Sequence, residues 1–163
     1  MLKAILILPC NILITIPAII LYFCEPTMIK PAFSITYVLM LLFFASGLIL
    51  MIWTMRLFAT VGHGSPAPWN PINKLITTGP YACVRNPMLS GVFLFLLGEA
   101  ILFQSWELSL YWLIFVVINA FYFPLSEEKA LLKRYGKDYE TYKNNVPRFI
   151  PRITAYKLSL IHI

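Results

Sequence analysis

An apolar run over residues 35–57 constrains the fold of this chain more than any other feature, because its single charged side chain, Arg56, lies at its end. A helix of about 20 apolar residues crosses the hydrocarbon core of a bilayer, and shorter runs can cross where the bilayer thins locally. Three further apolar runs occupy residues 5–23, 88–103 and 108–123. We therefore expect an all-α integral membrane protein with about four transmembrane helices.

The composition of the chain excludes the main alternatives. Hydrophobic residues make up 60% of the 163 residues and charged residues 12%. Soluble domains average roughly 45–50% apolar and about 25% charged residues, so a compact soluble enzyme is excluded, and so is an intrinsically disordered chain. The length suits a single domain, residues 1–163. A signal peptide over the first run is the alternative there, but that run is longer than usual for one and no A-x-A motif follows it.

The basic residues fall on one side of the expected membrane. With four spans, twelve of the thirteen Lys and Arg residues share a side, and Lys30 is the exception. By the positive-inside rule, both termini and the segments 58–87 and 124–163 are then expected in the cytoplasm, with the spans in the inner or plasma membrane. The net charge of +6 lies close to the spans, so we expect anionic lipid head groups as its partners and no nucleic acid.

Side chains that bind metals are few. The cysteines Cys10, Cys24 and Cys83 show no CxxC spacing, and His63 and His162 lie far apart in the sequence. These residues offer neither a disulfide framework nor the ligand set of a zinc or haem site. We expect no metal centre, and the sequence leaves the oligomeric state open.

Glycine and proline gather between residues 60 and 87. This segment is too long for a simple connector, which usually takes about two to six residues. Its apolar side chains, including Trp69, Leu75, Ile76 and Tyr81, also make it too apolar for a solvated linker. We expect it to fold against another part of the protein.

Residues 126–152 are expected to form a helical block. A helix is predicted to begin with Ser126 as its N-cap, after a break at Pro124, because two acidic residues follow in the first turn, where the helix dipole favours them. Gly136 is predicted to end this helix. A second helix is predicted over about residues 138–144.

Two blocks within these segments resemble a known family. The first, residues 79–91, resembles the signature GPYxxVRxPxxxG of the isoprenylcysteine carboxyl methyltransferase family. The second, residues 127–151, resembles the C-terminal block EE…YGxxYxxYxxxVPRxIP of the same family. Phospholipid N-methyltransferases are similar in both blocks, and the resemblance covers roughly residues 60–152. Asn86 departs from the histidine of many prenylcysteine enzymes, and asparagine cannot titrate near neutral pH.

The resemblance implies an enzyme, a membrane-bound methyltransferase with S-adenosylmethionine as its cofactor. The cofactor would bind on the cytoplasmic side, where the C-terminal helical block closes a pocket near the start of the third span. The acceptor would be lipid-like, either the carboxyl of a prenylated cysteine-type substrate or the amine of a phospholipid. The cofactor-binding residues are expected to be Tyr81, Arg85, Asn86, Pro87, Gly91, Glu99, Glu128, Tyr139 and Tyr142. The catalytic residues are expected to be Arg148, Glu128 and Glu127.

Methyl transfer makes modest demands on these residues. Because a sulfonium is a good leaving group, the reaction needs mainly alignment and desolvation. A carboxylate acceptor needs no base, and Arg148 could hold it. An amine acceptor must lose a proton, for which Glu127 or Glu128 is the candidate base.

Each of these residues could instead serve the structure alone. An acid about twelve residues into a span is costly, so Glu99 either lines the cofactor pocket or is a neutral acid bonded to another helix. Glu127 and Glu128 could simply cap a helix. Arg85 and Arg148 could anchor the chain at the membrane surface, where Tyr139 and Tyr142 could also lie as interfacial aromatic residues. Pro87 could start a helix, and Gly91 and Gly98 could allow helices to pack closely.

Two other functions stay open. A membrane sterol or enone reductase of similar architecture would use NADPH and would need a cluster of basic residues for its phosphate. The chain has only one close arginine pair, Arg148 and Arg152, which disfavours this function. A non-catalytic membrane module is disfavoured by the intact acids, arginines and tyrosines of the two blocks.

Overall fold

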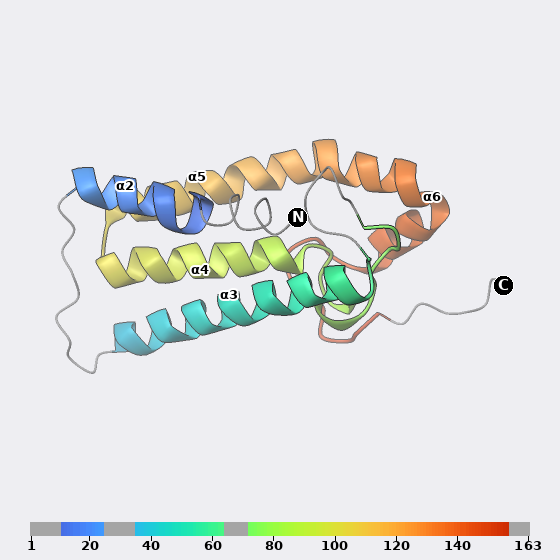
Figure 1. Ribbon diagram of the computed structural model, residues 1–163, viewed down its shortest axis with the longest axis horizontal. Coiled ribbons are helices and arrows are strands. Elements are labelled where there is room, and N and C mark those ends of the chain that lie inside the picture. Colours follow the sequence, from blue (N-terminus) through green and yellow to red (C-terminus); the bar gives the residue numbers. More distant parts are fainter. Residues whose placement is uncertain (1–10, 25–34, 64–71, 157–163) are drawn as a thin grey trace. The chain divides into compact units, whose positions relative to one another are not determined.

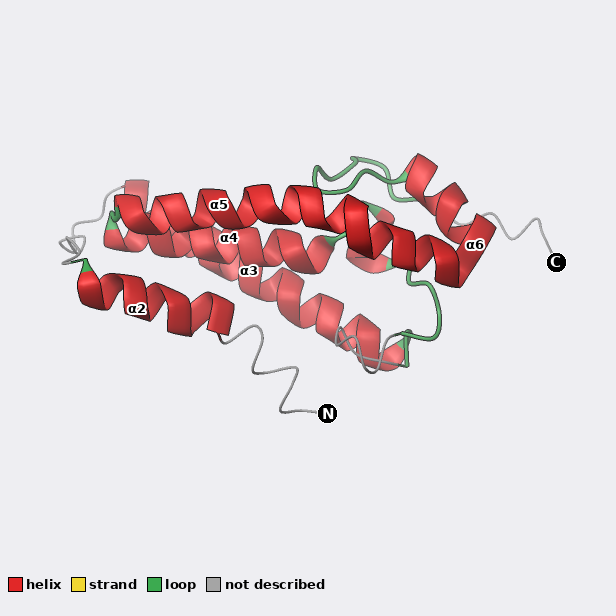
Figure 2. Ribbon diagram, turned by 90° about the horizontal axis from the view of Figure 1, so that it is seen from above, coloured by secondary structure: helices red, strands yellow, loops and turns green. Residues whose placement is uncertain are grey.

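The computed structural model describes residues 11–24, 35–63 and 72–156, and within them the structure is helical and has no strand (Figures 1 and 2). This confirms the expected all-helical class. The α-helices are α2 (Ile16–Phe23), α3 (Ile35–Thr60), α4 (Pro87–Phe103), α5 (Trp106–Tyr122) and α6 (Glu128–Asn145). The shorter turns are the π-helical η1 (Asn11–Thr15) and η3 (Phe123–Glu127) and the 3₁₀ turn η2 (Gly79–Ala82).

Among the described residues, two helices are long and apolar enough to cross a membrane: α3 and the helical stretch Trp106–Asn145, which joins α5, η3 and α6. The helices Asn11–Phe23 and Pro87–Phe103 are apolar but shorter. Residues 5–10 of the first expected span, like both chain termini, lie outside the described residues. Four spans therefore stay a prediction.

The predicted helix start at Ser126 is wrong. The backbone stays helical from Tyr122 (φ −62°, ψ −44°) to Glu128 (φ −65°, ψ −34°), so Ser126 caps nothing. Pro124 lies inside the π-helical turn η3. Such a turn shifts the backbone hydrogen bonds by one residue, and this irregularity accommodates a proline that an ideal helix would exclude.

Residues 1–52 and 89–118 form one compact unit. Its described core contains Leu13, Met51, Val92 and Leu96. In this unit α3 and α4 run alongside each other (Figure 1).

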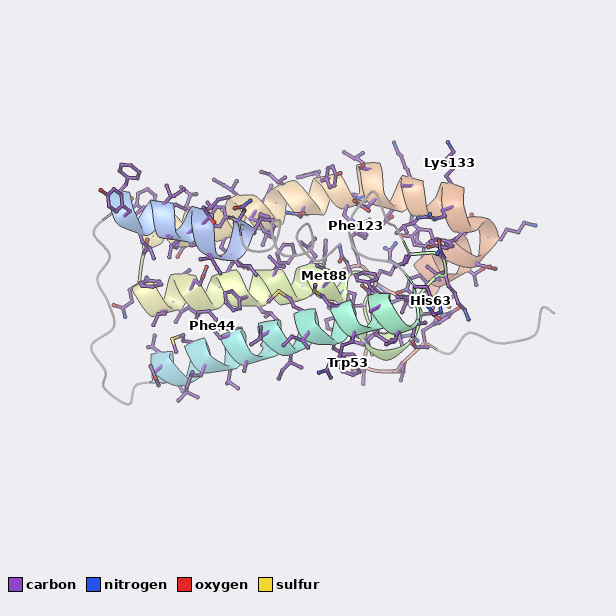
Figure 3. The ribbon with its side chains drawn as sticks, in the orientation of Figure 1. Phe44, Trp53, His63, Met88, Phe123 and Lys133 are labelled. Carbon is purple, nitrogen blue, oxygen red and sulfur yellow. The ribbon has the colours of Figure 1, made fainter. Side chains whose placement is uncertain are left out.

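Two glycines allow this close approach of α3 and α4. A Cβ atom on Gly47 would lie 2.7 Å from the carbonyl oxygen of Gly91, and one on Gly91 would lie 2.9 Å from the carbonyl oxygen of Gly47. A Cβ on Gly98 would meet the ring of Phe44 at 3.3 Å, and Phe44 lies on α3 beside α4 (Figure 3). Packing of the small-residue kind thus accounts for Gly91 and Gly98.

Replacing Gly47 with alanine should destabilise this unit, because the new methyl group meets backbone atoms that cannot rotate away. We expect a loss of about 1–3 kcal/mol in the free energy of unfolding, measured by thermal unfolding in detergent. Gly98→Ala is the matched control and should cost less, since its nearest neighbours lie 3.3 Å away. Equal losses in the two variants would contradict the proposed contact.

Residues 53–88 and 119–163 form the other compact unit. Its described core contains Tyr139, Tyr142 and Val146, with Leu75 and Tyr135 among the side chains packed against them. The described part of the glycine- and proline-rich segment, from residue 72 onwards, thus packs against the C-terminal block as expected, whereas residues 64–71, which include Trp69, lie outside the described residues.

Gly136 interrupts α6 at the position predicted from the sequence. Its backbone angles (φ 55°, ψ −128°) lie outside the helical region, and helical structure resumes after it. The predicted break at Gly136 is therefore confirmed as a kink after which the helix resumes, whereas the helix that precedes it does not begin at Ser126.

Candidate functional site

The two sequence blocks that suggest chemistry lie side by side in the second unit. The segment before α4 and the segment after α6 are joined by four backbone hydrogen bonds. The donor and acceptor pairs are Arg85 N–H to Pro147 C=O (2.8 Å), Asn86 N–H to Arg148 C=O (3.2 Å), Arg152 N–H to Cys83 C=O (3.0 Å) and Tyr156 N–H to Ala82 C=O (2.8 Å). These bonds fix where the side chains of Arg85 and Arg148 begin.

The carboxylate of Glu128 is the centre of the site. Its side chain is only 2% exposed. Its Oε1 accepts hydrogen bonds from Nη1 of Arg85 and Nε of Arg148, both at 2.8 Å. Its Oε2 lies 3.0 Å from Nζ of Lys143. One buried acid therefore draws together three cations from three parts of the chain.

These neighbours decide the charge of Glu128. Burial by itself raises the pKa of a carboxyl group, because it penalises the charged form. Here the hydrogen bonds from Arg148 and Lys143 and the charges of Arg85 and Arg148 outweigh burial, so the pKa of Glu128 lies below its ordinary value. Glu128 is accordingly ionised at neutral pH.

The kink at Gly136 makes the contact with Lys143 possible. Glu128 and Lys143 are fifteen residues apart in the chain. In a straight helix, with a rise of about 1.5 Å per residue, they would be separated by about 22 Å. The change of direction at Gly136 returns the second half of α6 to the first, and the ion pair forms across the kink.

Two buried polar atoms at this site have no hydrogen-bond partner among the described residues: Nε of Arg85 and the hydroxyl oxygen of Tyr139. Tyr139 is 1% exposed. Burial, followed by the negative charge of Glu128, raises the pKa of the Tyr139 hydroxyl, although Arg85 and Arg148 act in the opposite sense. Buried polar atoms are normally paired, so these two mark the place where a polar group could be accommodated.

Three other expected cofactor contacts have structural roles. The hydroxyl of Tyr142 donates to the backbone carbonyl of Tyr81 at 2.7 Å. Burial raises the pKa of both hydroxyl groups, so neither ionises at neutral pH. Pro87 is buried and is the first residue of α4, as helix initiation predicts.

The remaining expected site residues make no contact with Glu128 that the structure describes. Glu127 is exposed, although it adjoins Glu128 in the chain. Gly91 and Glu99 belong to α4 in the first unit, where Oε2 of Glu99 is buried and has no hydrogen-bond partner among the described residues. The structure describes no group of three His, Cys, Asp or Glu side chains that could hold a metal ion.

Sequence reasoning missed Lys143. A lysine in a mixed-charge helix is usually solvated, and its separation from Glu128 carries no contact signal on its own. The helix break predicted at Gly136 was the one available indication that residues on the two sides of it could meet.

Comparison with known proteins places the chain in a family. The family model for phospholipid methyltransferase matches residues 35–138. The chain belongs to the phospholipid methyltransferase family. The matched region includes Arg85 and Glu128, whereas Tyr139, Lys143 and Arg148 follow it.

Two curated proteins are similar to this family member over about half of its length. Protein-S-isoprenylcysteine O-methyltransferase of Schizosaccharomyces pombe (strain 972 / ATCC 24843) is 35% identical over 86 residues, which are 52% of this chain and 36% of that protein. The nickel-cobalt-cadmium resistance protein NccN of Alcaligenes xylosoxydans xylosoxydans is 27% identical over 95 residues, which are 55% of this chain and 43% of that protein. The matched regions thus span less than half the length of these relatives.

Two tyrosines of this phospholipid methyltransferase family member should respond differently to loss of the hydroxyl. Tyr142→Phe leaves a buried carbonyl without its partner and should cost about 1–3 kcal/mol in the free energy of unfolding. Tyr139→Phe removes a hydroxyl that has no partner among the described residues and should change stability by less than about 0.5 kcal/mol. Thermal unfolding in detergent measures both, and a larger loss for Tyr139→Phe would contradict these contacts.

The charge of Glu128 should make the stability of the protein depend on pH. The pKa of Glu128 is lower in the folded than in the unfolded protein. Its ionised carboxylate therefore stabilises the fold at pH values above the pKa of the unfolded state, and this stabilisation is lost as the pH falls through the pKa of the folded state. We expect the melting-temperature difference between the wild type and Glu128→Gln to shrink as the pH falls from about 7 to about 3. Glu127→Gln, at an exposed position, should show no such trend, and a constant difference for Glu128→Gln would contradict the lowered pKa.

Proposed function

We propose that this chain is a membrane-embedded methyltransferase that uses S-adenosylmethionine and acts on a lipid-like acceptor. The observation that carries the proposal is the joining of the two family blocks around one buried, ionised acid, with an arginine from each block on the same carboxylate oxygen. Membership of the phospholipid methyltransferase family supports it, and so does the similarity to a protein named as an O-methyltransferase.

The residues present suit the polar end of this cofactor. S-adenosylmethionine supplies an electrophilic methyl group when bound, and it also carries a carboxylate and an ammonium group. Three cations surround a single carboxylate at the site, so its positive charge is in excess. Arg85 and Arg148 would hold the carboxylate through charge-assisted hydrogen bonds, and Tyr139 would supply a further donor. Glu128 is the candidate partner for the ammonium group.

The charge of Glu128 bears on which acceptor the site favours. An efficient general base has a pKa near the working pH, whereas the pKa of Glu128 is held below its ordinary value. Glu128 would therefore orient Arg85 and Arg148 rather than accept a proton, and Glu127 is exposed. An acceptor that already carries a carboxylate needs no base, so the site favours a carboxyl group over a phospholipid amine.

The wider arrangement of the protein belongs to the same proposal. Residues 1–163 would act as a single methyltransferase-like domain with four spans, whose cytoplasmic segments 58–87 and 124–163 close the cofactor pocket. Both termini would face the cytoplasm from the inner or plasma membrane. A tag after Ile163 should be accessible only from the cytoplasmic side, and access only from outside the cell would overturn this orientation.

Binding of S-adenosylhomocysteine to the purified full chain in detergent tests the proposal. We expect calorimetry to detect binding to the wild type and to Glu127→Gln, and at least tenfold weaker binding to Glu128→Gln. Binding of NADPH without S-adenosylhomocysteine would favour the reductase, and binding of neither would favour a non-catalytic module. Unchanged affinity in both Glu128→Gln and Arg148→Ala would remove these residues from the site.

A further inference from the structure

The two oxygens of the Glu128 carboxylate are held unequally. Oε1 accepts hydrogen bonds from two guanidinium groups at 2.8 Å. Among the described residues, Oε2 has a single ion-pair partner, the ammonium group of Lys143 at 3.0 Å. The carboxylate is thus fixed from one side and covered by one side chain on the other.

The three cations also differ in how firmly they are held. Arg85 and Arg148 belong to backbone segments that hydrogen-bond to each other, and Arg85 is 9% exposed. Lys143 is 42% exposed, and its ammonium group sits on a flexible four-carbon stem. Because the lysine end of this pair is solvated, we take the effect of the pair on an equilibrium constant to be only about two- to fivefold. Lys143 is therefore the partner that Glu128 loses most easily.

Charge limits what can replace Lys143. The oxygen that it covers belongs to a buried carboxylate, and exposing that oxygen without a cation would leave its charge poorly compensated. A ligand that brings one ammonium group would exchange one positive charge for another and leave both arginines in place. The site is therefore suited to exchange of the Lys143 ammonium group for the ammonium group of a ligand.

We propose that Lys143 covers an ammonium subsite at Oε2 of Glu128 and that the amine of a bound ligand displaces it. This inference rests on the proposed function, and the amine has two candidate sources. One source is the amino group of the cofactor, and the other is the head-group amine of a phospholipid. Lys143 is then a specificity-determining residue that competes with the ligand.

Lysine reactivity detects this exchange without any need for turnover. The full chain in bicelles is treated with an amine-acylating reagent, and labelling at each lysine is followed by mass spectrometry. Lys133 is the internal reference, because it is exposed and points away from α6 (Figure 3). We expect Lys143 to label several-fold more slowly than Lys133 in the ligand-free protein, and as fast as Lys133 in Glu128→Gln. Equal labelling in the ligand-free wild type would overturn the inference.

Two probes distinguish the sources of the amine. S-adenosylhomocysteine should raise labelling of Lys143 to the level of Lys133 if the amine is that of the cofactor. Phosphatidylethanolamine in the bicelles, compared with phosphatidylglycerol, should do so if the amine is that of a lipid. If neither probe raises labelling, the inference is overturned. If calorimetry detects S-adenosylhomocysteine binding while Lys143 stays protected from both probes, the inference fails and the proposed function stands.

Affinity supplies a second readout. For the probe that releases Lys143, we expect Lys143→Met to bind about two- to fivefold more tightly than the wild type, because the competing cation is gone. Lys133→Met is the matched control and should bind as the wild type does. Weaker binding to Lys143→Met would mean that Lys143 supports the ligand site and would overturn the inference.

Discussion

Glu128→Gln is expected to lower the free energy of unfolding by about 3 kcal/mol, the cost of breaking a buried ion pair while its partners stay in place. The substitution keeps the shape of the side chain but removes the charge that holds Arg85, Arg148 and Lys143 together. Arg85, which is 9% exposed, would be left without compensation. Denaturant or thermal unfolding in detergent measures the loss.

The neighbouring residue supplies the control for this result. Glu127→Gln removes an equal charge from an exposed side chain one position earlier, so it should change stability by less than about 0.5 kcal/mol. If the two variants lose similar stability, the effect comes from the net charge of α6 and the Glu128 cluster is not a structural centre. If neither variant loses stability, the ion pairs are not formed in the folded protein.

Gly136→Ala should produce the second large loss of stability. The backbone of Gly136 (φ 55°, ψ −128°) lies in a region that residues with a Cβ atom avoid. Beyond its chain neighbours and the adjacent helix backbone, nothing lies within 4 Å of the place where that Cβ would be, so the cost comes from the backbone conformation. We expect a loss of about 1–3 kcal/mol, or else a straightened helix that separates Lys143 from Glu128.

The exposed neighbour Lys137 provides the comparison. Lys137→Ala changes the next side chain in the same part of α6 and should leave stability within about 0.5 kcal/mol of the wild type. Alanine favours helices over glycine by about 1 kcal/mol, so a Gly136→Ala protein that is more stable than the wild type would show that the kink is not required.

Local patterns in the sequence predicted much of the helical structure. Apolar runs located α3, α4 and α5 within a few residues, because a span needs a continuous apolar stretch. Gly136 was identified as a break because glycine tolerates backbone angles that other residues avoid. Pro124 misled the prediction, since a π-helical turn accommodates it, and a single sequence carries no signal that separates such a turn from a helix end.

The candidate site was predictable only in part. Glu128, Arg85 and Arg148 stood in the two blocks that resemble a family, and the structure brings them onto one carboxylate. The distinction between Glu128 and Glu127 depends on which side of α6 is covered by the segment before α4, and that is a long-range contact. Tyr142 shows the same limit, because its hydroxyl is bound to the backbone of Tyr81, sixty-one residues away.

Transfer of a labelled methyl group tests the central claim most directly. The purified full chain is incubated with S-adenosylmethionine that carries a labelled methyl group and with a total lipid extract, and the label in the lipid fraction is counted. We predict label in a lipid-like product with the wild type and with Glu127→Gln, and at least a tenfold loss with Glu128→Gln. Release of the label as methanol on base treatment would identify a methyl ester of a carboxyl group, as the lowered pKa of Glu128 favours. Equal transfer by Glu128→Gln and the wild type, or no transfer by a wild type that is folded, would contradict the account.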